Sequence, residues 1–370
     1  MPGPDITRLP SEAPSEGPSE GRRSLHGKRA ATFWFLLIGF LFSTGVSVAV
    51  PAQPLQTQPA APAAPPAASP SAASPSASQG QPADQNGTFV IRKDVDEVLL
   101  HATVIDGKQR MVTDLDRSAF TVFEDGKPQN IVSFRHEDIP VAMGIVIDNS
   151  GSMREKRTKV NQAALNLVRS SNPQDEVFVV NFNDEYYLDQ DFTNDLLKLK
   201  EALEKIDAKG GTALYEAVVA SAEHLKDNAR LDRKVLFVVT DGEDNASRET
   251  LEQAVKQLQV ENGPSVYAIG LLGEEEHPKR ARRALEIVAE RTGGLAFFPK
   301  TLDEVDEISR QVAHDIRNQY TIGYRPTNPR ASGGFRTIRV EAKTKGHNKL
   351  TVRTKSGYYA GAQNRASASK

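Results

Sequence analysis

The hydrophobic residues in the middle of the chain follow two alternating patterns. Short unbroken apolar runs are typical of strands that are buried on both faces of a sheet. Between these runs, apolar residues recur every three or four positions, which is the spacing of one face of a helix. This alternation predicts an α/β fold over residues 139–318, with a doubly wound, mostly parallel sheet flanked by helices.

The two patterns place the individual elements of this domain. Residues 186–192 are interpreted as an antiparallel edge strand. The apolar runs predict strands over residues 141–147, 176–182, 234–240, 266–272 and 295–298. Helices are predicted over residues 195–206 and 278–292, and along the apolar stripes that begin at Val160, Leu214, Leu251 and Leu302.

Shorter strand-like segments lie on both sides of the α/β domain. Neither side has enough strands to form a core of its own. We therefore expect them to pair into one small β-sandwich-like subdomain, built from residues 88–138 and 319–360, although two separate meanders are the alternative. The predicted strands are residues 97–106, 120–124, 130–135, 319–325, 335–343 and 349–354.

The first third of the chain has the composition of an exported, tethered protein. Residues 31–50 are apolar, contain no charge, and are long enough to cross a bilayer. The basic residues Arg22, Arg23, Lys28 and Arg29 precede them, and the next charge is Asp84. This asymmetry keeps the amino terminus in the cytoplasm and sends the rest of the chain out.

The segment over residues 31–50 is either an uncleaved transmembrane signal anchor or a signal peptide that is cleaved after export. Its length favours the anchor, on the cell membrane, over a secreted protein. Residues 1–30 are expected to be a disordered cytoplasmic tail, and residues 361–370 a disordered end. Residues 51–87, rich in Pro, Ala and Ser, predict an extended linker.

Composition and missing motifs exclude several classes of function. The net charge of −2 gives no electrostatic reason to expect a nucleic-acid partner. The chain has no cysteine, which excludes disulfides and thiolate metal sites. It also contains neither a phosphate-binding G-x-x-x-x-G-K-[ST] loop nor a zinc-binding H-E-x-x-H pair. We therefore expect a protein that is not an enzyme.

Oxygen-bearing side chains gather where the first buried strand ends. The apolar run over residues 141–147 is followed by Asp148, Ser150 and Ser152 at alternate positions. Ligands of open α/β sheets bind beyond the carboxyl ends of the strands. One carboxylate and two hydroxyls at this spacing can converge on a small, hard cation.

Two further pieces follow later in the chain. Thr212 opens a predicted helix after two glycines, and Asp241 follows the apolar run over residues 234–240. Together with Asp148, Ser150 and Ser152, they resemble the metal-ion-dependent adhesion site of the von Willebrand factor type A family. The family pattern, D-x-S-x-S followed by T and then D, is complete in this chain, and the resemblance covers residues 140–318.

The resemblance implies a binding module. By analogy with the family, Ser150 and Ser152 would bind Mg²⁺ or Mn²⁺ directly, and Thr212 directly or through water. Asp148 and Asp241 would neutralise the charge of the ion. A carboxylate from a partner protein would then complete the coordination shell, which requires no chemical reaction.

The segments around the domain carry a wider resemblance. Phe120 to Lys127, with the sequence F-T-V-F-E-D-G-K, and Gly357 to Ala360, with the sequence G-Y-Y-A, resemble a bacterial group of secreted type A-related proteins. This likeness implies an architecture and adds little about function.

Other interpretations of these residues stay open. Each piece taken alone can be a helix cap or an ordinary turn. The domain can also be a structural or assembly component of a cell-envelope complex, in which the metal only stabilises the fold. A hydrolase is a remote alternative, because Ser150 would need a base. Asn183, Asp184 and Glu185 form either a solvated hairpin turn or part of the ligand surface, with a second cation as a further option.

Overall fold

The computed structural model describes residues 97–205, 208–273, 278–347 and 349–361. The predicted cytoplasmic tail, membrane segment and linker, and most of the predicted carboxyl-terminal tail, lie outside these residues. None of the helices in the described part of the chain is long and apolar enough to span a bilayer.

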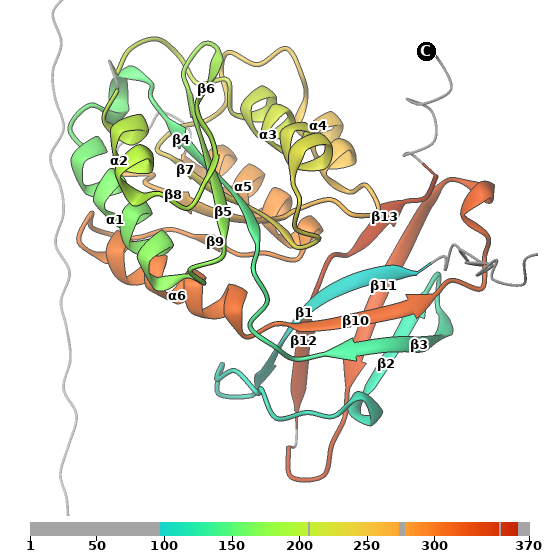
Figure 1. The fold of residues 1–370 in the computed structure, drawn as a ribbon. Coiled ribbons are helices and arrows are strands. Elements are labelled where there is room, and N and C mark those ends of the chain that lie inside the picture. The colour runs from blue at the N-terminus through green and yellow to red at the C-terminus, as the bar shows by residue number, and fades with distance from the viewer. Residues whose placement is uncertain (1–96, 206–207, 274–277, 348, 362–370) are drawn as a thin grey trace, which may run out of the picture. The chain divides into compact units, whose positions relative to one another are not determined.

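Six strands form the sheet of the α/β domain (Figure 1). All are parallel except the edge strand β6, which runs antiparallel to β5. This confirms the predicted α/β fold with a mostly parallel sheet. The order is β6-β5-β4-β7-β8-β9, with β4 at Ala142–Asp148, β5 at Glu176–Phe182, β6 at Tyr186–Thr193, β7 at Lys234–Thr240, β8 at Ser265–Gly270 and β9 at Ala296–Phe297.

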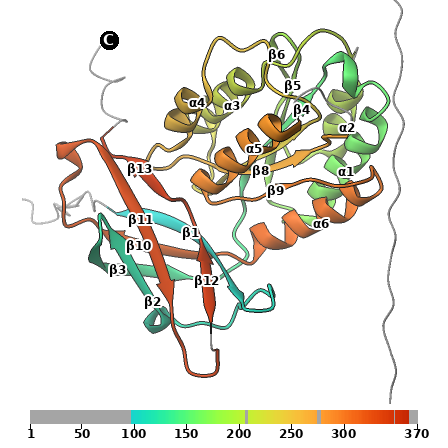
Figure 2. The same ribbon diagram turned by 180° about the vertical axis from the view of Figure 1, so that it is seen from behind.

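Helices cover both faces of this sheet (Figures 1 and 2). Alternate residues of β4 enter different cores: Ile145 and Ile147 join one cluster, and Val146 joins the other. Burial on both faces is the reason for the unbroken apolar runs. The first face is covered by α1 at Arg157–Ser170, α2 at Leu196–Glu204 and α6 at Glu304–Arg317, and the second by α3 at Leu214–Asn228, α4 at Leu251–Leu258 and α5 at Pro278–Thr292.

The segments before and after the α/β domain share one antiparallel sheet of seven strands. Strand β10 lies between β1 and β3, and β11 pairs with β2. The order is β12-β1-β10-β3-β2-β11-β13, with β1 at Val98–Asp106, β2 at Phe120–Glu124, β3 at Lys127–Arg135, β10 at Tyr320–Arg325, β11 at Phe335–Ala342, β12 at Leu350–Arg353 and β13 at Gly357–Tyr359. Short 3₁₀ turns occur at Arg117–Ala119, Gly151–Met153 and Arg330–Ser332.

This second sheet differs from the predicted sandwich. A sandwich has two sheets facing each other, whereas here all seven strands belong to one sheet. Apolar residues from β1, β2, β3, β10, β11 and β13 nevertheless meet in one core cluster. Strongly twisted sheets can curl in this way, so that one sheet encloses its own core.

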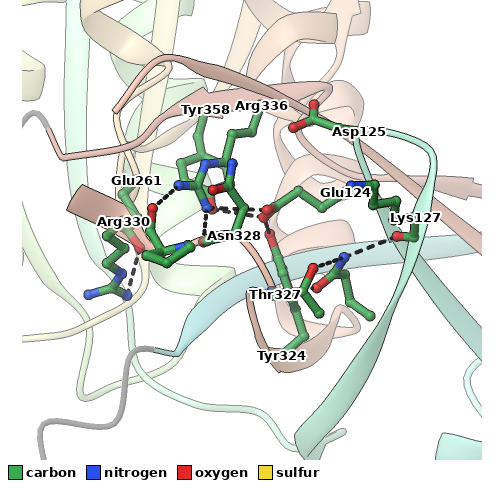
Figure 3. A network of polar contacts seen from close by, with 12 residues as sticks. Glu124, Asp125, Lys127, Glu261, Tyr324, Thr327, Asn328, Arg330, Arg336 and Tyr358 are labelled. Atoms are coloured by element: carbon green, nitrogen blue, oxygen red, sulfur yellow. Dashed lines mark hydrogen bonds and ion pairs between the residues drawn. The ribbon is translucent and has the colours of Figure 1, made fainter. Parts of the chain in front are cut away.

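A buried polar network joins four strands of the antiparallel sheet (Figure 3). The Glu124 carboxylate at the end of β2 accepts hydrogen bonds from the hydroxyls of Tyr324 and Tyr358 and from Nη1 of Arg336. Arg336 Nη2 also donates to the carbonyl of Pro329, at 2.7 Å. Burial and the bond to Glu124 raise the pKa of the Tyr324 hydroxyl, which therefore stays a donor. Buried charges need this degree of pairing to be tolerated.

A second buried carboxylate, that of Asp175, fixes the entry to strand β4. Its oxygens accept hydrogen bonds from the backbone N–H groups of Val141, at 2.8 Å, and Asn172, at 3.1 Å. Burial raises the pKa of Asp175 from 3.8 to about 6. The folded protein therefore holds the proton at pH values where the unfolded chain has lost it.

Replacing Asp175 with asparagine should flatten the pH dependence of stability. Because the pKa of Asp175 is raised in the folded state, its contribution to the free energy of unfolding is fully present below about pH 4. This contribution is lost as the pH rises through about 6. Between pH 4.5 and 7.5 the wild type should lose about 1–3 kcal/mol relative to Asp175→Asn, as measured by urea unfolding. The exposed Asp303→Asn is the control. Equal pH profiles for wild type and Asp175→Asn would contradict the assignment.

Candidate metal site

Three loops meet at the carboxyl edge of the parallel sheet. The loop after β4 contacts the loop before α3 through a hydrogen bond from Gly151 N to the carbonyl of Gly210, at 3.3 Å. The loop before α3 contacts the loop after β7 because Thr212 N donates to Asn245 Oδ1 at 2.8 Å, and Asn245 N donates back to the Thr212 carbonyl at 3.0 Å. All five predicted site residues lie on these loops or directly at the strand ends.

Four of the five residues form a continuous chain of hydrogen bonds. Ser150 N donates to Asp148 Oδ1 at 2.8 Å, and the hydroxyls of Ser150 and Ser152 are 3.2 Å apart. Ser152 Oγ donates to Asp241 Oδ1, also at 2.8 Å. Thr212 lies on the neighbouring loop, and its backbone is hydrogen-bonded to Asn245, on the loop that follows Asp241.

Burial divides the site into an inner and an outer part. Asp148 and Asp241 are 0% exposed, and Ser150 and Thr212 are 3% exposed. Ser152, in contrast, is an exposed residue. Of the five predicted residues, Ser152 is the exposed one, and its hydroxyl contacts the buried Asp241 carboxylate.

Both oxygens of Asp148 already have donors. Ser150 N binds Oδ1, and the hydroxyl of Thr240 binds Oδ2 at 2.5 Å. Burial, with a smaller contribution from the nearby Asp241 carboxylate, raises the pKa of Asp148 to about 6. Two neighbouring buried carboxylates favour a cation beside them.

These residues fit a small, hard divalent cation. Hydroxyl oxygens of Ser150, Ser152 and Thr212, with a carboxylate oxygen of Asp241, are the ligands that Mg²⁺ prefers. Asp148 would contribute to the site indirectly, because both of its carboxylate oxygens already accept hydrogen bonds, from Ser150 N and from the Thr240 hydroxyl. The described residues contain no group of three or more histidine or acidic side chains that could hold a metal, so a site here depends on hydroxyl ligands.

Sequence reasoning missed two side chains that contact the carboxylates of the predicted site. Lys156 Nζ forms an ion pair with Asp241 Oδ2. Thr240 binds Asp148, although it comes from the neighbouring strand β7. The signals in the sequence were weak: Lys156 follows Ser152 by about one helical turn, and Thr240 is the only hydroxyl residue in its apolar run.

The turn over residues 183–185 supports the loop that carries Thr212. Asp184 Oδ1 accepts a hydrogen bond from Gly211 N at 2.8 Å, and the carbonyl of Asn183 accepts one from Ala213 N at 2.6 Å. A Cβ atom on Gly210 would lie 2.0 Å from Asp184 Oδ2, and one on Gly211 would lie 2.7 Å from Asn245 Oδ1. The turn is therefore hydrogen-bonded to the loop that carries Thr212.

One part of the chain matches a family model. Residues 143–243 match the model described as the von Willebrand factor type A domain. Residues 143–243 are similar to a type A domain. The match begins within β4 and ends three residues after the end of β7, so it includes all five predicted site residues.

Several solved structures are similar to this chain. A von Willebrand factor type A protein from Catenulispora acidiphila is 15% identical, over 72% of this chain and 75% of its own, with a TM-score of 0.42. The PilB minor pilin from Streptococcus sanguinis is 13% identical, with a TM-score of 0.41. That similarity covers 50% of this chain and 62% of the pilin chain, so this chain spans less than two thirds of the pilin's length.

An aerotolerance-related membrane protein from Bacteroides fragilis is also similar to part of this chain. It is 20% identical over 48% of this chain and 98% of its own, with a TM-score of 0.40. The comparison with curated proteins finds no match.

Proposed function

We propose that the type A domain captures a partner protein through a divalent cation, Mg²⁺ or Mn²⁺. The cation would be held by Asp148, Ser150, Ser152, Thr212 and Asp241. The observation that carries the proposal is the contact between the hydroxyl of Ser152, an exposed residue, and the fully buried Asp241 carboxylate. It gives a cation site one inner, charged side and one side that is open to solvent.

Each residue has a distinct part in this proposal. The hydroxyls of Ser150, Ser152 and Thr212 would bind the cation without adding charge, and Asp241 would supply a carboxylate oxygen. Asp148 would orient the loop that carries Ser150, because its Oδ1 accepts a hydrogen bond from Ser150 N at 2.8 Å. When bound, the cation would offer a coordination position to a carboxylate oxygen of the partner.

We also propose that the domain works outside the cytoplasm. The apolar residues 31–50, with basic residues before them, would anchor it in the cell membrane, and residues 51–87 would space it from the surface. The described residues start at residue 97, so this part of the proposal depends on sequence alone.

Chelation should abolish partner capture. We expect the full chain to retain a partner from native envelope extracts with Mg²⁺ and to lose it with EDTA, with recovery when Mg²⁺ is restored. Asp148→Ala should lose capture and also Mn²⁺ binding, measured by paramagnetic resonance titration, because the Ser150 loop loses its acceptor. Mass identification of the eluted protein would name the partner.

Asp303→Ala is the matched control, because it removes an exposed carboxylate outside the site. Capture that persists at full strength both in EDTA and in Asp148→Ala would contradict the proposal. If Asp148→Ala lowers thermal stability while capture persists, the metal has only the structural role of the alternative assembly function.

A further inference from the structure

The ammonium group of Lys156 occupies the charged side of the proposed cation site. Its Nζ pairs with Asp241 Oδ2, while Ser152 Oγ donates to the other oxygen, Oδ1. The Asp241 side chain is 0% exposed and that of Lys156 is 26% exposed. The buried carboxylate thus has a cation that belongs to the chain itself.

We infer that Lys156 competes with the divalent cation for Asp241 and thereby sets the metal affinity of the domain. This inference rests on the proposed function, since it assumes that Ser152 and Asp241 bind a metal. A divalent ion bound to Ser152 and Asp241 would lie within a few ångströms of the ammonium. Like charges at that distance repel strongly where water is largely excluded.

The position of Lys156 allows its ammonium group to move away from the Asp241 carboxylate. It lies in the turn between the 3₁₀ turn Gly151–Met153 and helix α1, and its partly exposed side chain has a flexible four-carbon stem. Rotation of that stem can carry the ammonium into solvent without moving α1. Helix α1 stays fixed because Arg157 Nη1 donates to the carbonyl of Asp148 at 3.1 Å.

Two properties follow from competition of this kind. Without a divalent ion, Lys156 neutralises Asp241, which stabilises the fold around the buried carboxylate. With the ion present, the lysine must move away, so part of the binding free energy is offset by breaking the ion pair. The domain therefore binds its metal more weakly than it would if Lys156 did not compete for Asp241. In the metal-free protein, Lys156 compensates the charge of the buried Asp241 carboxylate.

The test compares Mn²⁺ binding by the wild-type full chain, Lys156→Met and Lys159→Met. Lys159→Met removes the same charge three residues further along, where the side chain is half exposed and pairs with Asp303. Lys156→Met should bind Mn²⁺ roughly 10- to 100-fold more tightly than wild type, because the competing cation is gone. Lys159→Met should match wild type, since charges in solvent are screened.

Thermal unfolding gives a second readout. In EDTA, Lys156→Met should melt at a lower temperature than wild type, because Asp241 has lost its cation. The increase in melting temperature on adding saturating Mn²⁺ should be larger for Lys156→Met than for wild type. A lysine with a purely structural role would lower the melting temperature equally with and without Mn²⁺.

The outcomes separate this inference from the proposed function. Tighter Mn²⁺ binding by Lys156→Met supports competition, including the case in which wild type binds too weakly to measure. Equal or weaker binding by Lys156→Met, with measurable binding by wild type, overturns competition and leaves the metal site standing. If neither protein binds Mn²⁺, the proposed function fails, and the inference fails with it.

Discussion

Replacing Arg336 with methionine should lower the free energy of unfolding by about 3–5 kcal/mol. The side chain is 1% exposed and donates to Glu124 Oε1 at 3.2 Å. It also donates to the carbonyls of Asn328 and Pro329. Methionine has a similar length but no donors, so the variant leaves a buried carboxylate without its cation and the Asn328 carbonyl without this donor. The Pro329 carbonyl keeps its hydrogen bond from Ser332 N.

Chemical denaturation followed by circular dichroism measures this effect. Arg339→Met is the matched control, because Arg339 lies on the same strand β11, and its side chain is 57% exposed. Its loss should cost less than about 1 kcal/mol. An Arg336→Met variant that is as stable as Arg339→Met would show that the network contributes little.

The double variant Glu124→Gln with Arg336→Met isolates the cause of the loss. Glutamine keeps an acceptor for the hydroxyls of Tyr324 and Tyr358 but carries no charge. We therefore expect the double variant to be more stable than Arg336→Met alone, because the uncompensated charge is removed with its partner.

Replacing Gly210 with alanine should weaken Mn²⁺ binding by about 10- to 100-fold, which is the usual cost of disturbing residues that orient metal ligands. Gly210 has a φ of +75°, a conformation that residues with a Cβ rarely adopt. The new Cβ would also lie 2.0 Å from Asp184 Oδ2. Asp184 would have to move, and Gly211 N would lose its acceptor beside Thr212.

Mn²⁺ titration of three further variants makes this prediction specific. Gly107→Ala is the control, since nothing lies within 4 Å of the added Cβ. Asp184→Ala should weaken binding on its own, because Gly211 N loses its acceptor. In the double variant, Gly210→Ala should add little to that loss, because the clashing carboxylate is gone and mainly the backbone strain remains. Unchanged affinity in Gly210→Ala would contradict the proposed role of this loop.

The sequence was most informative where residues are buried on both sides of one element. The runs over residues 176–182 and 234–240 coincide with β5 and β7. Burial on both faces favours apolar residues at most positions, so the run has the same ends as the strand. Asp125 and Gly126 adopt positive φ angles, of 49° and 76°, and Asp-Gly is a dipeptide that tight hairpin turns favour.

The antiparallel sheet shows where local patterns stop being informative. Alternating apolar residues indicate that one face of a strand is buried, but not which strand lies beside it or what covers that face. The strands before and after the α/β domain pair in one curved sheet, and the sequence suggested a sandwich instead. Strand β13, at Gly357–Tyr359, is too short to show any alternation.

The sequence by itself determined the parallel sheet, its helices and the positions of the five oxygen-bearing residues, because local periodicity marks where buried strands end. Only the tertiary structure decided which side chains meet those residues. Lys156 and Asp241 are separated by 85 positions, Thr240 and Asp148 by 92, and Arg336 and Glu124 by 212. Such pairs depend on strand order and loop geometry, which are set by the packing of the whole chain, so local spacing does not specify them.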